Sequence, residues 1–161
     1  MPITGILKKR FHQFIQWTAA TALLVLIPFC ASTLRGPVPN GESIVLEAKQ
    51  FLGTPYSAGG SHKEGMDCSG LVVRVFSQAS GKSMPHSADR LFKMGRPVSL
   101  RSLQQGDLVF FRENRGDTVS HVGIYLGNME FIHASLRGVI ISRLDSAYYQ
   151  SRFAGARRLY P

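Results

Sequence analysis

The apolar residues of this chain change their spacing once along the sequence, and this change limits the possible folds more than any other feature. In 43–52 and 67–79 they recur every three or four positions, which is typical of helices buried on one face, and a shorter helix is predicted between Ser87 and Gly95. After residue 106 the apolar runs are short and strand-like. The predicted strands are 107–111, 121–126, 131–135, 139–144 and 154–159. Helices followed by strands predict an α+β fold, with N-terminal helices packed on an antiparallel sheet.

The length of 161 residues predicts one folded domain rather than two. Hydrophobic residues make up 44% of the chain and charged residues 18%, as in globular proteins. Residues 33–42 contain two prolines and two glycines and are expected to form a linker. We therefore predict a targeting segment over 1–32, a linker over 33–42 and a single domain over 43–161.

Residues 1–32 have the pattern of a targeting segment. Lys8–Arg10 form a basic head, and the 15 residues Trp17–Ala31 carry no charge. Small residues at Cys30 and Ser32 suit cleavage of a signal peptide after Ser32, and export to the periplasm or cell envelope follows from that interpretation. A retained membrane anchor, a lipid on Cys30 and a buried N-terminal helix are the alternatives.

The predicted domain is less basic than the net charge of the whole chain suggests. The sequence has 19 basic and 10 acidic residues, a net charge of +9. Four basic residues and no acidic residue precede position 37, so the remainder has 15 basic and 10 acidic residues, a net charge of +5. No run of Lys and Arg with interleaved aromatic residues follows position 36. We therefore expect no nucleic-acid partner, and we expect membrane contact only through the N-terminal segment.

Cys68 is the only cysteine after residue 30, so the predicted domain has no partner for an internal disulfide. It directly follows Asp67, which is placed to cap the predicted helix. In the first turn of a helix, exposed N–H groups and the helix dipole lower the pKa of a thiol and can bind an oxyanion. The position favours a nucleophile over a small core cysteine. Asp67 is interpreted first as the cap and second as a polar group that orients the turn.

Two of the five histidines lie in strand-like apolar runs, whereas His62 and His86 lie in polar loops. A thiol nucleophile needs an imidazole base and a third group that orients this base. His121 and His133 flank a turn predicted at Gly127–Asn128, and paired residues of an antiparallel hairpin have a constant sum of residue numbers. An even sum puts both rings on one face, and a sum of 256 makes the histidines diagonal neighbours. The alternative is two structural histidines that are buried separately.

Other chemistries lack their sequence motifs. There is no Cys-x-x-Cys or His-Glu-x-x-His pair for a metal, no Gly-x-Ser-x-Gly for a serine hydrolase and no phosphate-binding loop. Cys68, His121 and His133 could form a metal-binding set only if the fold arranged them as ligands. We therefore predict no metal ion and no cofactor.

Short motifs rich in glycine and apolar residues surround the candidate nucleophile and the two strand histidines. They are Gly53–Tyr56, Gly59–Gly60, Asp67–Val72, Gly106–Phe111, His121–Tyr125, Phe131–Ser135 and Gly155–Arg158. Their content and order resemble those of the NlpC-type cell-wall cysteine peptidases, from about residue 43 to the C-terminus. The resemblance implies a papain-like α+β fold with the nucleophilic cysteine at a helix N-terminus.

The resemblance also implies a reaction. Cys68 is the implied nucleophile, His121 the general base and His133 the polar group that orients it, and together they would hydrolyse peptidoglycan through a thioester. The implied bond lies near diaminopimelate and is either a D,D cross-link or a γ-D-glutamyl–diaminopimelate bond. Cys68 precedes His121, whereas the permuted lecithin–retinol acyltransferase relatives carry histidine first. The alternative function is a catalytically silent envelope-binding module on the same fold.

The substrate side of the implied site is less complete. The resemblance places Tyr56 in the cleft, and Asp67 and Ser69 are expected beside it as substrate contacts. Family members often have arginine where this chain has His86, so the subsite there is expected to differ. The substrate partner is the stem peptide of peptidoglycan, and the protein is expected to act as a monomer.

Overall fold

The computed structural model describes residues 40–112 and 118–161. Its helices are α1 (Gly41–Lys49), α2 (Cys68–Ser80), α3 (Ala88–Phe92) and α4 (Ala147–Gln150), with a 3-10 turn, η1 (Leu100–Ser102). Helices α1 and α2 contact each other, and α2 also contacts the main sheet. The predicted order of helices before the strands of the main sheet is confirmed for α1, α2 and α3, whereas the short α4 precedes the last strand and the small β1–β2 hairpin precedes α2.

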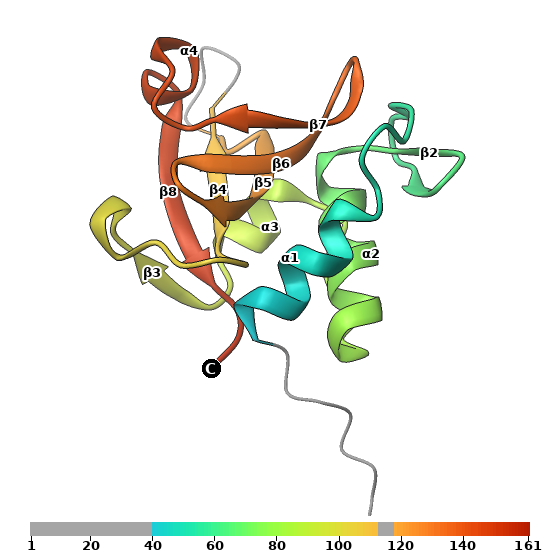
Figure 1. The fold of residues 1–161 in the computed structure, drawn as a ribbon, viewed down its shortest axis with the longest axis horizontal. Helices are drawn as coiled ribbons and strands as arrows, with labels where there is room; N and C mark the ends of the chain where they lie inside the picture. Colours follow the sequence, from blue (N-terminus) through green and yellow to red (C-terminus); the bar gives the residue numbers. More distant parts are fainter. Residues whose placement is uncertain (1–39, 113–117) are drawn as a thin grey trace, which may run out of the picture. The chain divides into compact units, whose positions relative to one another are not determined.

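One antiparallel sheet of six strands packs against these helices (Figure 1). In spatial order its strands are β3 (Arg96–Val98), β8 (Phe153–Arg158), β4 (Leu108–Phe111), β5 (His121–Gly127), β6 (Glu130–Ser135) and β7 (Gly138–Arg143). The C-terminal strand therefore lies inside the sheet, between β3 and β4. A separate hairpin of β1 (Ser61–His62) and β2 (Gly65–Met66) precedes α2. The predicted α+β fold with an antiparallel sheet is confirmed.

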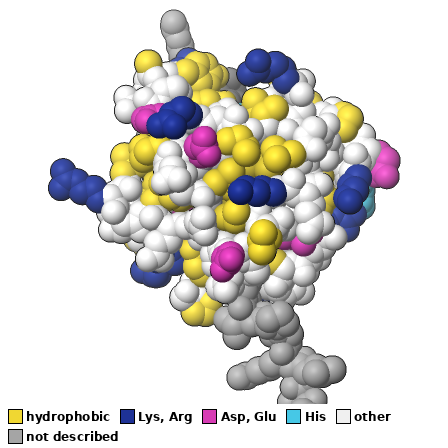
Figure 2. Space-filling view, viewed as in Figure 1, with side chains coloured by type: hydrophobic (Ala, Val, Ile, Leu, Met, Phe, Trp, Pro, Cys, Tyr) yellow, Lys and Arg dark blue, Asp and Glu magenta, His cyan; other side chains and the backbone are white. Residues whose placement is uncertain are grey.

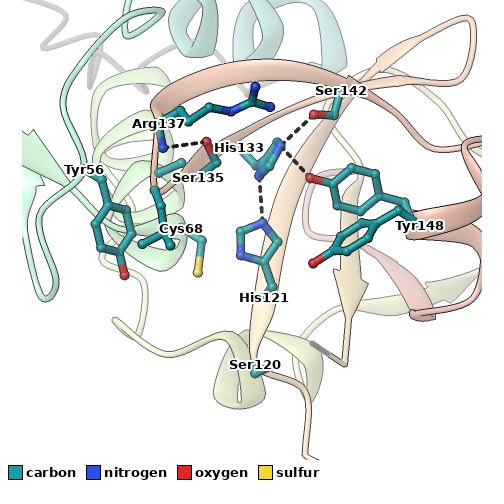
Figure 3. Close-up of a pocket in the computed structure, with 12 residues that line it drawn as sticks. Tyr56, Cys68, Ser120, His121, His133, Ser135, Arg137, Ser142 and Tyr148 are labelled. Atoms are coloured by element: carbon teal, nitrogen blue, oxygen red, sulfur yellow. Dashed lines mark hydrogen bonds between the residues drawn. The ribbon is translucent and has the colours of Figure 1, made fainter. Parts of the chain in front are cut away.

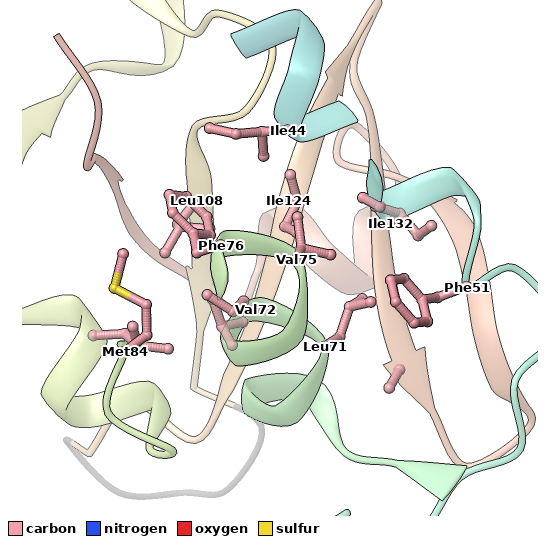
Figure 4. Packing of buried hydrophobic residues seen from close by; sticks show 14 of the residues in the cluster. Ile44, Phe51, Leu71, Val72, Val75, Phe76, Met84, Leu108, Ile124 and Ile132 are labelled. Carbon is pink, nitrogen blue, oxygen red and sulfur yellow. The ribbon is translucent and has the colours of Figure 1, made fainter. Parts of the chain in front are cut away.

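Each face of the sheet has its own apolar cluster. In β4, Leu108 and Phe110 belong to a cluster that includes Val72 and the rest of the apolar stripe of α2 (Figure 4). Val109 and Phe111 alternate with them and belong to a second, smaller cluster, as the period of two along a strand requires. Helices α1 and α2 thus cover one face of the sheet. The site described below uses side chains from both faces of the sheet.

Helix α1 begins two residues earlier than predicted, so the predicted linker 33–42 extends too far. Asn40 and Ser43 form a capping box: the Asn40 side chain accepts from the Ser43 N–H (2.8 Å), and the Ser43 hydroxyl accepts from the Asn40 N–H (3.2 Å). Such a box satisfies N–H groups that a helix start leaves without helical partners. Gly41 and Glu42 are therefore helical, although their composition suggested a linker.

The turn between β5 and β6 lies one residue later than predicted. Asn128 and Met129 have positive φ angles (51° and 61°) and connect Gly127 to its partner Glu130. Two residues of this kind form a tight turn whose twist matches an antiparallel hairpin. The register shifts between Tyr125 and Gly127, so paired residues sum to 257 at the turn and to 256 beyond it.

Five short elements escape the sequence analysis: β1, β2, β3, η1 and α4. Each spans two to four residues, too few for a hydrophobic period to appear. Strand β3 forms because β8 supplies its hydrogen-bonding partner. Its Pro97 lacks an N–H group, which an edge strand tolerates.

The predicted targeting segment, residues 1–32, lies outside the described residues. Within 40–112 and 118–161, no helix has the length and hydropathy needed to cross a membrane. On the face drawn in Figure 2, Lys and Arg side chains are scattered among hydrophobic and acidic ones rather than joined in one stripe.

Candidate active site

The cysteine predicted as the nucleophile is the first residue of α2 and carries a thiol. Asp67 caps this helix: Oδ1 accepts from the Gly70 N–H (2.7 Å), and Oδ2 accepts from the Gly59 N–H (2.8 Å). One carboxylate thus joins the helix start to the loop before it. The predicted cap is confirmed, and the half-buried Cys68 lies in the first turn, among N–H groups that the helix does not use internally.

Asp67 is held as a carboxylate by its partners. Burial would raise its pKa, but hydrogen bonds from the Gly70 N–H, His86, the Ser69 hydroxyl and the Gly59 N–H outweigh burial and lower the pKa. His86 Nε2 and Ser69 Oγ each lie 2.9 Å from Asp67 Oδ1. Asp67 is therefore ionised at neutral pH, beside the positive end of the helix dipole.

The helix start fits closely under the preceding loop because Gly70 has no side chain. A Cβ atom at this position would overlap the carbonyl oxygen of Gly60 and come within 3.1 Å of His86 Nε2. The same Gly60 oxygen accepts from the Asp67 N–H at 3.0 Å. Packing therefore explains the glycine two residues after Cys68, and it fixes the cysteine relative to the loop.

The two strand histidines are hydrogen-bonded to each other. Ile124 pairs with Ile132 in the β5–β6 hairpin. Their residue numbers sum to 256, which is the predicted register. It places His121 and His133 as diagonal neighbours on one face. His121 Nε2 lies 2.8 Å from His133 Nδ1, and the two ring planes are 87° apart. The predicted register is confirmed, and the alternative of two separately buried histidines is wrong.

His133 is enclosed by protein, with 1% of its surface exposed. Its Nε2 lies 2.9 Å from Ser142 Oγ and 3.2 Å from the Tyr149 hydroxyl. Burial, and then the charges of His121 and Arg137, lower the pKa of His133 to about 3. His133 is therefore a neutral imidazole at neutral pH, with both ring nitrogens in hydrogen bonds.

These contacts decide how a proton can move through the histidine pair. A neutral imidazole has one N–H and one lone pair. When His133 Nδ1 accepts from the Nε2–H of His121, the Nε2–H of His133 donates to the oxygen of Ser142 or Tyr149. Nδ1 of His121 is then the ring nitrogen away from His133, and Figure 3 shows the Cys68 sulfur beside that ring. The arrangement can accept a thiol proton at His121 and stabilise the resulting imidazolium.

A cavity of about 540 Å³ connects these groups (Figure 3). Its lining brings together Cys68, His121 and His133 from α2, β5 and β6, and it includes Tyr56, which was predicted to line the cleft. The other lining residues are Ser120, Ala134, Ser135, Leu136, Arg137, Ser142, Tyr148 and Tyr149.

Asp67 and Ser69, predicted as substrate contacts, do not line this cavity. Ser69 is buried, with 6% of its surface exposed, and its hydroxyl donates to the Asp67 carboxylate. Both side chains turn back toward the helix start, because a cap must reach the N–H groups of the first turn. Their role in the structure is to hold the turn that carries Cys68.

The remaining described histidines have partners in the protein. His62 Nδ1 lies 2.8 Å from Arg74 Nη2, and His86 pairs with Asp67. His86 therefore supports the helix cap. Within 40–112 and 118–161, no group of three or more His, Cys, Asp or Glu side chains is placed to hold a metal ion.

Three residues that contact His133 or lower its pKa escape the sequence analysis. Ser142 pairs with Phe131 in β6–β7 and is thus a diagonal neighbour of His133. Its position as a serine inside an apolar strand is the sequence feature that could have indicated this contact. Tyr149 reaches His133 from α4, 16 residues away, and no pattern indicates this contact. Arg137 lies in the β6–β7 turn, where a charged residue is ordinary.

The sequence model of the NlpC/P60 family matches residues 53–158. "Murein DD-endopeptidase MepS/Murein LD-carboxypeptidase" of Escherichia coli (strain K12) is 47% identical over 110 residues, 68% of this chain and 57% of that protein. This chain thus spans little more than half the length of that relative.

Two further known proteins match most of the described domain. A "Probable endopeptidase" of Haemophilus influenzae is 38% identical over 162 residues, 94% of this chain and 99% of that protein. The crystal structure of an NlpC/P60 family protein from Bacillus cereus has a TM-score of 0.72 and 34% identity, over 78% of this chain and 42% of that one.

Proposed function

Because the chain belongs to the NlpC/P60 family, we propose that it is a peptidoglycan endopeptidase that hydrolyses amide bonds of stem peptides or their cross-links near diaminopimelate. The observation that carries the proposal is the cavity shared by Cys68, His121 and His133. A thiol at a helix start beside a hydrogen-bonded imidazole pair is the arrangement that a cysteine peptidase needs. The names of the E. coli relative favour a D,D cross-link or an L,D bond over other amides of the stem.

The proposed reaction proceeds through a thioester. Cys68 gives its proton to Nδ1 of His121, and the thiolate attacks the scissile carbonyl carbon. Backbone N–H groups in the first turn of α2 donate to the oxyanion. The His121 imidazolium then protonates the leaving amine, and the C–N bond breaks. Water, deprotonated by His121, attacks the thioester and releases the carboxylic acid and the thiol.

The proposal places the reaction in the cell envelope, where the substrate lies. Residues 1–32 serve in it as the export signal or N-terminal anchor, and 41–161 form the catalytic domain, which acts as a monomer. The basic head Lys8–Arg10 followed by uncharged Trp17–Ala31 supports the export step.

Digestion of purified muropeptides, followed by mass spectrometry, tests the proposal. The full chain is expected to release peptides that identify the bond cut. Cys68→Ser is expected to lower the rate by about 10³-fold or more, because a serine hydroxyl is a far poorer nucleophile than a thiolate at neutral pH. Thermal unfolding checks that the variant keeps its fold.

The matched control is Cys30→Ser, which removes the other cysteine of the chain and should leave turnover unchanged. Full activity of Cys68→Ser would rule out the thiol mechanism. Binding of muropeptides without hydrolysis by the wild-type chain would favour the silent binding module instead.

A further inference from the structure

Arg137 occupies the tip of the β6–β7 hairpin at the rim of the cavity, on a backbone that is held in place. Its N–H donates to Ser135 Oγ (3.1 Å), and the Ser135 hydroxyl donates to the Gly138 carbonyl (3.0 Å). The next residue, Val139, donates its N–H to the Thr54 carbonyl at 2.9 Å. The side chain of Arg137 therefore starts from a held backbone in the lining of the cavity that Cys68 also lines.

The guanidinium of Arg137 differs from those of the arginines that are held by carboxylates. Arg143 is paired with Asp145, and Arg158 is paired with Asp107, whereas Arg137 has no ion pair among the described residues. No acidic side chain occurs among the described residues that line the cavity. Arg137 is thus an exposed positive charge at a cavity whose described lining offers it no counter-charge.

The charge of Arg137 acts on the histidine side of the cavity. Figure 3 shows its side chain extending along the side where His133 lies, and its charge is one of the causes that lower the pKa of His133. His133 is hydrogen-bonded to His121, which protonates the leaving amine in the proposed reaction. The guanidinium therefore faces the half of the cavity where the leaving group is released.

We propose that Arg137 binds the free carboxylate of the residue whose amine is released when Cys68 is acylated. This inference rests on the proposed function. A cross-link amide is formed on an amine of a diamino acid whose neighbouring carboxyl group stays free, and a carboxypeptidase releases a C-terminal amino acid. Both reactions therefore have a carboxylate one carbon from the leaving amine. A guanidinium matches a carboxylate with two parallel hydrogen bonds, which selects it over a neutral amide.

The test compares two substrates that differ only in this group: a muropeptide with the free carboxylate on the leaving residue and the same muropeptide with that carboxylate amidated. The full wild-type chain is expected to prefer the free carboxylate by about 10-fold to 100-fold in kcat/KM, mainly through KM. Arg137→Gln should lose this preference by weakening only the reaction of the free carboxylate. Arg137→Lys should keep part of it, since the charge remains without the fork of donors.

Arg101→Gln is the matched control, because Arg101 is exposed on η1 and does not line the cavity. It should leave both substrates unchanged. A wild-type chain that cleaves both substrates equally would overturn the assignment, as would an Arg137→Gln variant that loses activity equally on both. A wild-type chain that cleaves no muropeptide would overturn the proposed function itself, and the carboxylate assignment with it.

Discussion

The hydrogen bond between two imidazoles gives His121 and His133 different parts in the proposed reaction. His121 lies between Cys68 and His133, whereas His133 Nε2 lies beside Ser142 Oγ. A proton that leaves the thiol can therefore reach His121 directly, whereas His133 influences that transfer only through its hydrogen bond to the His121 ring. The two histidines should respond differently to substitution.

His121→Ala is expected to lower kcat/KM by about 10³-fold, because it removes the general base and the group that protonates the leaving amine. His133→Gln is expected to lower kcat/KM by about 10-fold, since the glutamine carbonyl can still accept from the His121 Nε2–H. Muropeptide kinetics on both variants check this. Equal loss in two well-folded variants would mean that His133 does more than orient its neighbour.

The buried His133 should also make stability depend on pH. In the unfolded chain its pKa is near 6.5, and in the folded protein it is about 3, so between these values the unfolded state binds more protons. The contribution of His133 to stability is therefore lost as the pH falls from 6.5 toward 3, at no more than about 1.4 kcal/mol per pH unit.

Urea unfolding of the wild-type chain and of His133→Gln at pH 7, 5.5 and 4 measures this contribution. The free energy of unfolding of the wild type should fall more steeply with acid than that of the variant, because glutamine does not titrate. Parallel pH profiles would show that folding does not lower the pKa of His133.

At the scale of the element, the start of α2 is the part of the fold on which the site depends. The Asp67 carboxylate accepts from N–H groups of the helix and of the preceding loop. The helix start and the preceding loop pack so closely at Gly70 that no side chain fits between them. The cap therefore sets the position of Cys68 as well as the stability of the helix.

Asp67→Ala is expected to cost about 1–2 kcal/mol of stability and to slow the alkylation of Cys68 by iodoacetamide near pH 6. Labelling is done in the full chain with Cys30→Ser, so that only one thiol reacts. Asn40→Ala is the control: it removes the cap of α1, with a similar cost in stability, and should leave the labelling rate unchanged. An unchanged labelling rate in Asp67→Ala would show that the cap does not influence the reactivity of the thiol.

At the scale of the whole molecule, a buried ion pair ties the C-terminal strand into the sheet. Arg158 Nε and Nη2 lie 2.6 Å and 2.7 Å from the Asp107 carboxylate oxygens, and Asp107 has no exposed surface. Asp107 also accepts from the Gln104 N–H (2.8 Å). Burial, together with the charge of Asp107, raises the pKa of the adjacent Tyr160 to about 12. The pair holds β8 between β3 and β4. Strand β4 in turn pairs with β5, which carries His121.

Arg158→Met is expected to destabilise the protein by about 3–5 kcal/mol, because it leaves the carboxylate of Asp107 buried without its counter-charge. The double variant with Asp107→Leu should be less destabilised than the single one, since it removes that charge. Urea unfolding measures both. Arg143→Met, which breaks an exposed pair with Asp145, should leave the unfolding midpoint unchanged. A double variant as unstable as Arg158→Met would show that packing, not charge, decides the cost.

Local physics made several features of this molecule predictable. The apolar stripe of 67–79 predicted α2, which spans Cys68–Ser80, because a helix and its cap depend on neighbours within a few positions. The diagonal contact of His121 and His133 was predictable from the pleat of a hairpin, in which side chains alternate strictly between faces. The longer helices and strands, the cap and the histidine pair were therefore determined by the sequence itself.

The meeting of the thiol with the histidines was decided only by the tertiary structure. Cys68 packs against the cluster on the helix-covered face, whereas His121 and His133 share the strand parity of Tyr125, which belongs to the cluster on the other face. No period of the sequence relates one face to the other, because their relative position depends on how whole layers pack. For the same reason the contact of Tyr149 with His133 and the bond between Arg158 and Asp107 appear only once the chain is folded.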